Sequence, residues 1–90
     1  MTAHRTVEVV NKRGLHARAS AKFVKLASEF DAEVSVSRDG QTVDARSIMG
    51  LMMLGAGPGS MLDLTADGEQ ADAALDALCE LVSARFEEDE

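Results

Sequence analysis

Two side chains near the N-terminus, His16 and Arg18, have the chemistry and the spacing to hold a phosphoryl group. His16 follows the flexible Gly14 and precedes a helix-like segment, where the free backbone amides of a helix start point outward. An imidazole nitrogen can attack phosphorus, and the phosphoryl group would lie against those amides and the positive end of the helix dipole. The guanidinium of Arg18 offers a planar fork for phosphate oxygens. The alternative interpretation is that His16 only caps the helix.

The remaining reactive residues indicate no second site. His4 lies near the terminus and is expected to be solvated, while Cys79 is the only cysteine and can form neither an internal disulfide nor a metal cluster. Residues 55–59 are rich in glycine but lack the Lys-Ser/Thr of a P-loop, which favours a plain connector. The sequence has no Asp-Ser-Leu attachment motif of an acyl carrier, and no metal-ligand cluster or nucleophile-base pair of a free-standing hydrolase. We therefore expect no cofactor and no metal.

Charge is distributed unevenly along the chain, whose net charge is −7. Residues 1–50 hold eight Lys or Arg and six acids, whereas residues 51–90 hold one Arg and ten acids. Five basic residues and no acid lie between positions 12 and 25: Lys12, Arg13, Arg18, Lys22 and Lys25. The overall acidity argues against nucleic-acid binding. The basic segment suits an anionic ligand or an acidic partner, or else is a solvated helix face.

The length and composition predict one small domain that spans residues 1–90. Apolar residues make up 46% of the chain and charged residues 28%, which is typical of an ordinary globular protein. No apolar run approaches the length of a membrane span, and residues 1–5 lack the apolar region of a secretory signal. We expect a cytoplasmic protein that works as a monomer without membrane contact.

Alternating apolar and polar residues predict the strands that must support His16. This pattern covers residues 6–10, 32–38 and 61–67, and Asp39-Gly40 predicts a hairpin into a short strand at 41–45. Polar residues on one side of every strand indicate a sheet that helices cover on a single face.

Three helices are expected at residues 17–29, 47–54 and 69–86. Ser47 is the predicted N-cap of the second helix, and Gly55 ends it. The acidic residues 87–90 oppose the dipole of the third helix and should fray. The order β-α-β-β-α-β-α predicts an α+β fold, an open-faced β-sandwich with a four-stranded antiparallel sheet and three helices on one face.

Two short motifs resemble one known family over nearly the whole chain. Gly14-Leu15-His16-Ala17-Arg18 and, about thirty residues later, Ser47-Ile48-Met49-Gly50-Leu51-Met52 are similar to segments of HPr, the histidine-containing phosphocarrier family of the bacterial phosphoenolpyruvate-dependent phosphotransferase system. The resemblance implies that His16 is phosphorylated by enzyme I, that Arg18 assists, and that the phosphoryl group passes to a IIA protein. It also implies a carrier rather than an independent enzyme. Ala19 departs from the family, which usually has proline there.

The second helix is more apolar than one sheet face can bury, because it holds three Met together with Ile48, Leu51 and Leu54. Leu51 and Leu54 fit the inward side, which leaves Ile48, Met49 and Met52 for a partner. This agrees with the docking surface that the resemblance implies. The basic residues Arg18, Lys22 and Lys25 would form its rim.

Several alternatives stay open at this point. A ferredoxin-like regulatory or ligand-binding module would tolerate the loss of His16, and an acidic scaffold protein would need neither His16 nor Arg18. The pathway could drive sugar uptake or serve a regulatory, nitrogen-related branch. Ser47 matches the serine that an HPr kinase/phosphorylase modifies in some bacteria, or it is only a cap.

Overall fold

The helices and strands follow one another in the predicted order, and the computed structural model describes residues 2–88. Their bounds are β1 Thr2–Glu8, α1 Ala17–Ala27, β2 Glu33–Arg38, β3 Gln41–Asp44, α2 Ile48–Met53, β4 Met61–Asp67 and α3 Ala71–Ser83. A short 3₁₀ turn, Arg85–Glu87, comes after α3. Within residues 2–88, no helix has the length and the hydropathy of a membrane span.

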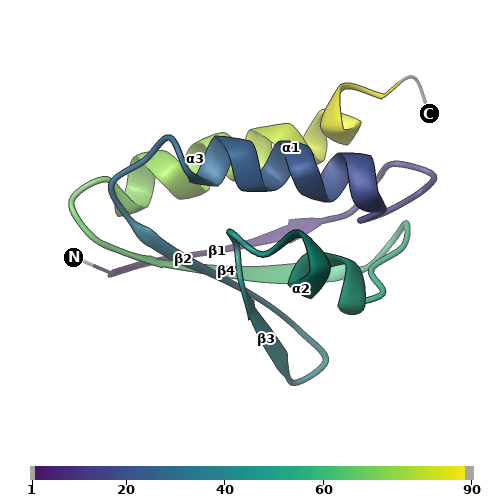
Figure 1. The fold of residues 1–90 in the computed structure, drawn as a ribbon, viewed down its shortest axis with the longest axis horizontal. Helices are drawn as coiled ribbons and strands as arrows, with labels where there is room; N and C mark the ends of the chain where they lie inside the picture. The colour runs from purple at the N-terminus through teal and green to yellow at the C-terminus, as the bar shows by residue number, and fades with distance from the viewer. Residues whose placement is uncertain (1, 89–90) are drawn as a thin grey trace.

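The four strands form one antiparallel sheet in the order β1-β4-β2-β3. Because β4 runs antiparallel to β1, Met61 at its start lies opposite Glu8 at the end of β1. The loop between β1 and α1 and the chain that follows α2 therefore meet at one end of the sheet. The helices α1 and α3 run in opposite directions, so the end of α3 returns to the start of α1 (Figure 1).

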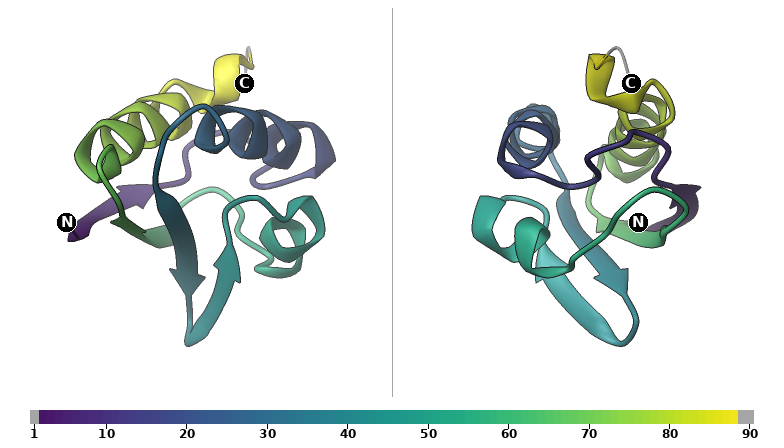
Figure 2. Two further views of the ribbon diagram at one scale, coloured as in Figure 1. Left: turned by 60° about the vertical axis from the view of Figure 1, so that its left-hand side comes forward. Right: turned by 90° about the vertical axis from the view of Figure 1, so that its right-hand side faces the viewer.

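The helices and the sheet share one aliphatic core on a single side of the sheet. The inward residues of β4, Leu62, Leu64 and Ala66, have no solvent exposure, and Phe23 of α1 and Leu78 of α3 are equally buried above them. Figure 2 shows α1 and α3 side by side over this face. The side chain of Leu51 in α2 belongs to the same core. The predicted α+β open-faced sandwich is confirmed.

The first strand begins and ends earlier than the alternation predicted. It runs from Thr2 to Glu8 rather than over 6–10, because residues 2–5 also pair with β4, as far as Asp67. Val9 still bonds across to the chain before β4: its amide donates to Ser60 at 2.8 Å and its carbonyl accepts from Gly59 at 2.8 Å. Beyond the end of β1, the chain therefore stays hydrogen-bonded to the segment before β4, and it then leads into the loop before His16.

The third helix is shorter than predicted, because it stops at Ser83 rather than at Phe86. Arg85, Phe86 and Glu87 all have positive φ angles, between 53° and 64°, which reverse the chain. Phe86 is fully buried, so the turn brings this ring into the core instead of leaving it on a continuing helix. The helical spacing from Val82 to Phe86 correctly predicted that both side chains are buried. It wrongly predicted that the backbone stays helical as far as Phe86.

Candidate functional site

The loop that carries His16 is held against the chain that follows α2. Gly14 has φ +63°, and a Cβ atom built on it would lie 2.1 Å from the carbonyl oxygen of Ala56, so only glycine fits there. The next amide, of Leu15, donates to the same carbonyl at 3.0 Å. This contact fixes the position from which His16 begins α1.

His16 is the N-cap residue of α1, but its side chain does not cap the helix. Its backbone is extended, with φ −74° and ψ 178°, and its carbonyl accepts the first helical hydrogen bond from Ser20 at 2.9 Å. The imidazole makes no hydrogen bond to the amides of the first turn. The interpretation that the ring serves only as a cap is therefore wrong, and the imidazole can take part in other chemistry.

The first turn of α1 presents donors that suit an anion. The amides of Ala17, Arg18 and Ala19 have no acceptor within residues 2–88, as expected of a helix start. The guanidinium of Arg18 is exposed, and no residue in the same range forms a hydrogen bond or an ion pair with it. Because Ala19 is not proline, it keeps an amide that a proline would lack. The start of α1 thus offers three amides and the positive end of the helix dipole directly after His16.

The C-terminal segment contributes two residues that the sequence analysis missed, Glu88 and Asn11. The Glu88 carboxylate forms a hydrogen bond with the His16 ring, with 2.5 Å between Oε2 and Nε2. Its other oxygen, Oε1, accepts from Asn11 Nδ2 at 3.1 Å. The predicted fraying of the tail is therefore wrong for Glu87 and Glu88, while residues 89–90 lie outside the described part. The available signal was the apolar Phe86, which anchors the chain two residues before Glu88.

The surroundings of Glu88 favour its charged form. Its side chain is only 16% exposed, and the His16 side chain is 23% exposed. Partial burial alone would raise the pKa of the Glu88 carboxyl, but hydrogen bonds from Asn11 and His16 outweigh it and lower that pKa below its ordinary value of 4.5. The site thus contains a carboxylate that faces the imidazole.

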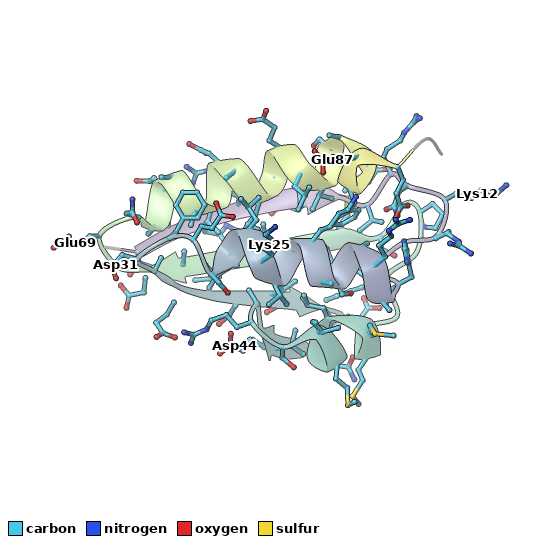
Figure 3. All side chains as sticks on the ribbon, turned by 45° about the horizontal axis from the view of Figure 1, so that its top comes forward. Lys12, Lys25, Asp31, Asp44, Glu69 and Glu87 are labelled. Carbon is cyan, nitrogen blue, oxygen red and sulfur yellow. The ribbon has the colours of Figure 1, made fainter. Side chains whose placement is uncertain are left out.

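Of the basic residues predicted to form the rim, Lys22 contacts the C-terminal turn, whereas Arg18 and Lys25 are exposed. Lys22 donates to the carbonyl of Phe86 at 2.7 Å and lies 3.9 Å from Glu87, so it holds the C-terminal turn. Lys25 is exposed on the outer side of α1 (Figure 3). Together with Arg18, it leaves positive charge on the solvent side of this helix.

The α2 helix buries and exposes the residues that the sequence predicted. Leu51 and Leu54 are buried, whereas Ile48, Met49 and Met52 are exposed. Met53, which the sequence analysis counted in the helix but did not assign to the exposed side, is the most exposed of the set at 74%. We call these four exposed residues the α2 patch: Ile48, Met49, Met52 and Met53. It lies beside the start of α1, because α1 and α2 pack against each other (Figure 1).

Ser47 is the N-cap of α2, as predicted. Its hydroxyl accepts from the amide of Gly50 at 2.9 Å. Ser47 is partly exposed and adjoins the α2 patch, so a group added to its hydroxyl would lie at the edge of that patch.

The other reactive residues lie away from this site. His4 is on the exposed face of β1, 3.7 Å from Asp63. Cys79 is half-buried in α3, and burial raises the pKa of its thiol, which favours the protonated form over the nucleophilic thiolate. No group of three or more His, Cys, Asp or Glu residues within 2–88 is arranged to hold a metal ion.

Comparisons with known proteins agree with one another. The family model described as "PTS HPr component phosphorylation site" matches residues 3–84. Phosphocarrier protein HPr of Cupriavidus necator is 52% identical, over 96% of this chain and 97% of that protein. Phosphocarrier protein NPr of Shewanella violacea is 50% identical, over 93% and 92%. The crystal structure of HPr-C-His from Thermoanaerobacter tengcongensis has a TM-score of 0.92 and 41% identity, over 98% of this chain and 99% of that one.

Proposed function

Because this chain belongs to the HPr family of phosphocarrier proteins of the phosphotransferase system, we propose that His16 accepts a phosphoryl group from phospho-enzyme I and passes it to a IIA protein. The observation that carries this proposal is the position of His16. His16 is the N-cap residue of α1, but its imidazole makes no capping hydrogen bond. The three amides that follow it have no acceptor within residues 2–88.

The geometry supports reversible transfer rather than permanent storage. A ring nitrogen of His16 attacks phosphorus, and the donor's bond to phosphorus breaks as the new N–P bond forms. The amides of the first turn and the Arg18 guanidinium stabilise the phosphoryl oxygens. Helix-terminus stabilisation of an anion amounts to about 0.3–2 kcal/mol, which is small enough for the group to be released to the next protein. The phosphoryl group comes from one protein, rests on His16 and leaves for another, so we describe the chain as a carrier and not as an enzyme that turns over alone.

Docking to both partners would use the α2 patch together with the charges of Arg18 and Lys25. An exposed group of Met and Ile side chains adapts to more than one partner, which a carrier with a donor and an acceptor requires. The nearby positive charges favour partners that present acidic residues. Phosphorylation of Ser47 by an HPr kinase/phosphorylase would place new negative charge at the edge of this patch.

The wider role follows from the same proposal. The chain works in the cytoplasm as a monomeric carrier, where enzyme I and IIA proteins act. The compared relatives include both an HPr and an NPr at similar identity, so the proposal covers sugar uptake and a regulatory, nitrogen-related branch alike.

The two histidines of the chain provide a matched test of the phosphorylated residue. Incubation with enzyme I, Mg²⁺ and phosphoenolpyruvate should add one acid-labile phosphate to the wild-type protein and to His4→Ala, but none to His16→Ala. His4 is a suitable control because it is exposed on β1, away from the start of α1. Undiminished labelling of His16→Ala would show that the phosphoryl group goes elsewhere.

A further inference from the structure

The C-terminal segment builds a hydrogen-bonded chain of three side chains at the start of α1. Glu88 uses both carboxylate oxygens: Oε2 contacts His16 Nε2 at 2.5 Å and Oε1 accepts from Asn11 Nδ2 at 3.1 Å. Asn11 is fully buried, and its Nδ2 also donates to the carbonyl of Gly14 at 3.0 Å. The loop before His16 and the tail that touches its ring are thus tied to the same amide group.

Specific contacts, rather than chance, hold the tail in this position. The three residues before Glu88 all have left-handed backbone angles, which non-glycine residues adopt only when the surroundings impose them. Burial of Phe86 and the hydrogen bond from Lys22 to its carbonyl supply those surroundings. The conformation of this turn therefore determines where Glu88, the next residue, is placed.

The chemistry of the contact determines which ring nitrogen is free. A carboxylate can only accept a hydrogen bond, so Nε2 of His16 must carry the proton, and the neutral ring then has its lone pair on Nδ1. We propose that Glu88 is a positioning residue that holds the His16 ring with Nε2 protonated and Nδ1 ready to attack phosphorus. This inference rests on the proposed function of His16 as the phosphoryl acceptor.

The proposed arrangement also balances the transfer step. The Nδ1 lone pair forms the new N–P bond, and the electron pair of the broken bond stays with the donor. The proton on Nε2 does not move, so the phosphorylated ring gains one positive charge. The Glu88 carboxylate faces that charge through the same hydrogen bond, much as a buried carboxylate stabilises the imidazolium of a serine-protease triad. On return transfer, the charge disappears with the phosphoryl group.

The test compares Glu88→Ala with wild type and with Glu87→Ala. Glu87 is a matched control, because it is the adjacent carboxylate but is 74% exposed and lies 3.9 Å from Lys22 rather than on His16. Proton NMR of the wild type, at a pH where the ring is neutral, should show a slowly exchanging Nε2–H signal of His16. That signal should vanish in Glu88→Ala and persist in Glu87→Ala. Enzyme I should label Glu88→Ala about tenfold more slowly than the other two proteins.

A third variant separates charge from geometry. Glu88→Gln retains an acceptor oxygen, so the Nε2–H signal should remain, while the loss of negative charge should still slow labelling. Labelling of Glu88→Ala at or above the wild-type rate would overturn the proposal and would mean that the tail only covers His16. Persistence of the ring signal in Glu88→Ala would overturn it as well. Failure of enzyme I to label even the wild type would instead contradict the proposed function of His16.

Discussion

The amide of Leu15 donates to the carbonyl of Ala56 at 3.0 Å, and this hydrogen bond joins the loop that carries His16 to the chain that follows α2. The segment that carries His16 and the segment that follows the α2 patch are therefore joined directly. Under the proposed function, a partner docked on the α2 patch would meet the imidazole at a defined place, which would lower the entropic cost of aligning it with the phosphoryl group.

Gly14→Ala should disrupt this junction. The new methyl group would meet the Ala56 carbonyl at 2.1 Å, and alanine resists φ +63°. We expect the free energy of unfolding to fall by more than about 2 kcal/mol, with slower labelling by enzyme I. Gly55→Ala is the matched control, because Gly55 has φ +64° but open space around it. It should cost only about 1 kcal/mol in chemical denaturation. Equal losses for the two variants would contradict the packing argument.

Met49→Asp should weaken docking to enzyme I by about tenfold or more without changing stability. The side chain is 73% exposed, so a carboxylate remains hydrated in the free protein but must be desolvated in the complex. Calorimetric titration measures the affinity, and urea denaturation should stay within about 0.5 kcal/mol of wild type. Met61→Asp is the control, since Met61 is exposed on β4 outside the α2 patch. Equal weakening by both variants would mean that the effect is one of net charge.

Arg18→Ala should keep His16 as the labelled residue and slow labelling by at least about tenfold. Arg18 makes no other interaction within residues 2–88, so its removal should leave the melting temperature unchanged. Rapid-quench kinetics gives the rate, with Arg13→Ala as the control for a lost positive charge nearby. If the two variants slow labelling alike, Arg18 contributes only to the general field and not to the phosphoryl group.

Ser47→Asp should keep the melting temperature and reduce the rate of labelling by enzyme I. Aspartate is also a good N-cap and can accept from Gly50, as Ser47 does at 2.9 Å. Its charge, however, adjoins the surface that we propose to bind acidic partners, so the expected effect is repulsion and not refolding. Ser47→Ala should behave oppositely, with a loss of about 1 kcal/mol in stability and normal labelling. Wild-type kinetics in Ser47→Asp would argue against regulation at this position.

The contact between Glu88 and His16 should make stability depend on pH in a defined direction. The pKa of the Glu88 carboxyl is lowered from 4.5 in the folded protein, so the unfolded chain binds its proton more readily. The stabilisation is therefore fully present above about pH 5 and is lost as pH falls through the folded-state pKa. Urea denaturation between about pH 3 and pH 7 should show the difference between wild type and Glu88→Gln shrinking towards the acid end. If the difference in unfolding free energy between the two proteins grew on acidification, the predicted direction of the pH dependence would be wrong.

Most of the fold could be predicted because its signals are local. Strict alternation in residues 61–67 and the spacing of Leu75, Leu78 and Val82 each identify an element and its buried face without any knowledge of its neighbours. The same reasoning correctly predicted that Leu51 is buried and Met49 exposed on α2, because a two-turn helix can bury only one side.

The tail could not be predicted because its conformation depends on distant contacts. Positive φ angles normally mark glycine, yet Arg85, Phe86 and Glu87 adopt them to bury one ring in a core that the rest of the chain builds. Local charge arguments for fraying therefore failed at Glu87 and Glu88, the two tail residues that the structure describes. The partners of Glu88 lie 72 and 77 residues away in sequence, at His16 and Asn11, and no periodicity reports such a pairing.

The proposed function requires that the phosphoryl group on His16 passes to another protein. The direct measurement is to label the chain with radioactive phosphoenolpyruvate, remove enzyme I, add a IIA protein and follow the label by gel. We expect the label to stay on the chain until IIA is added and then to appear on IIA at equal stoichiometry, leaving an unphosphorylated chain that enzyme I can label again. Label that remains on His16 in the presence of IIA proteins, or that is released as inorganic phosphate before IIA is added, would contradict it.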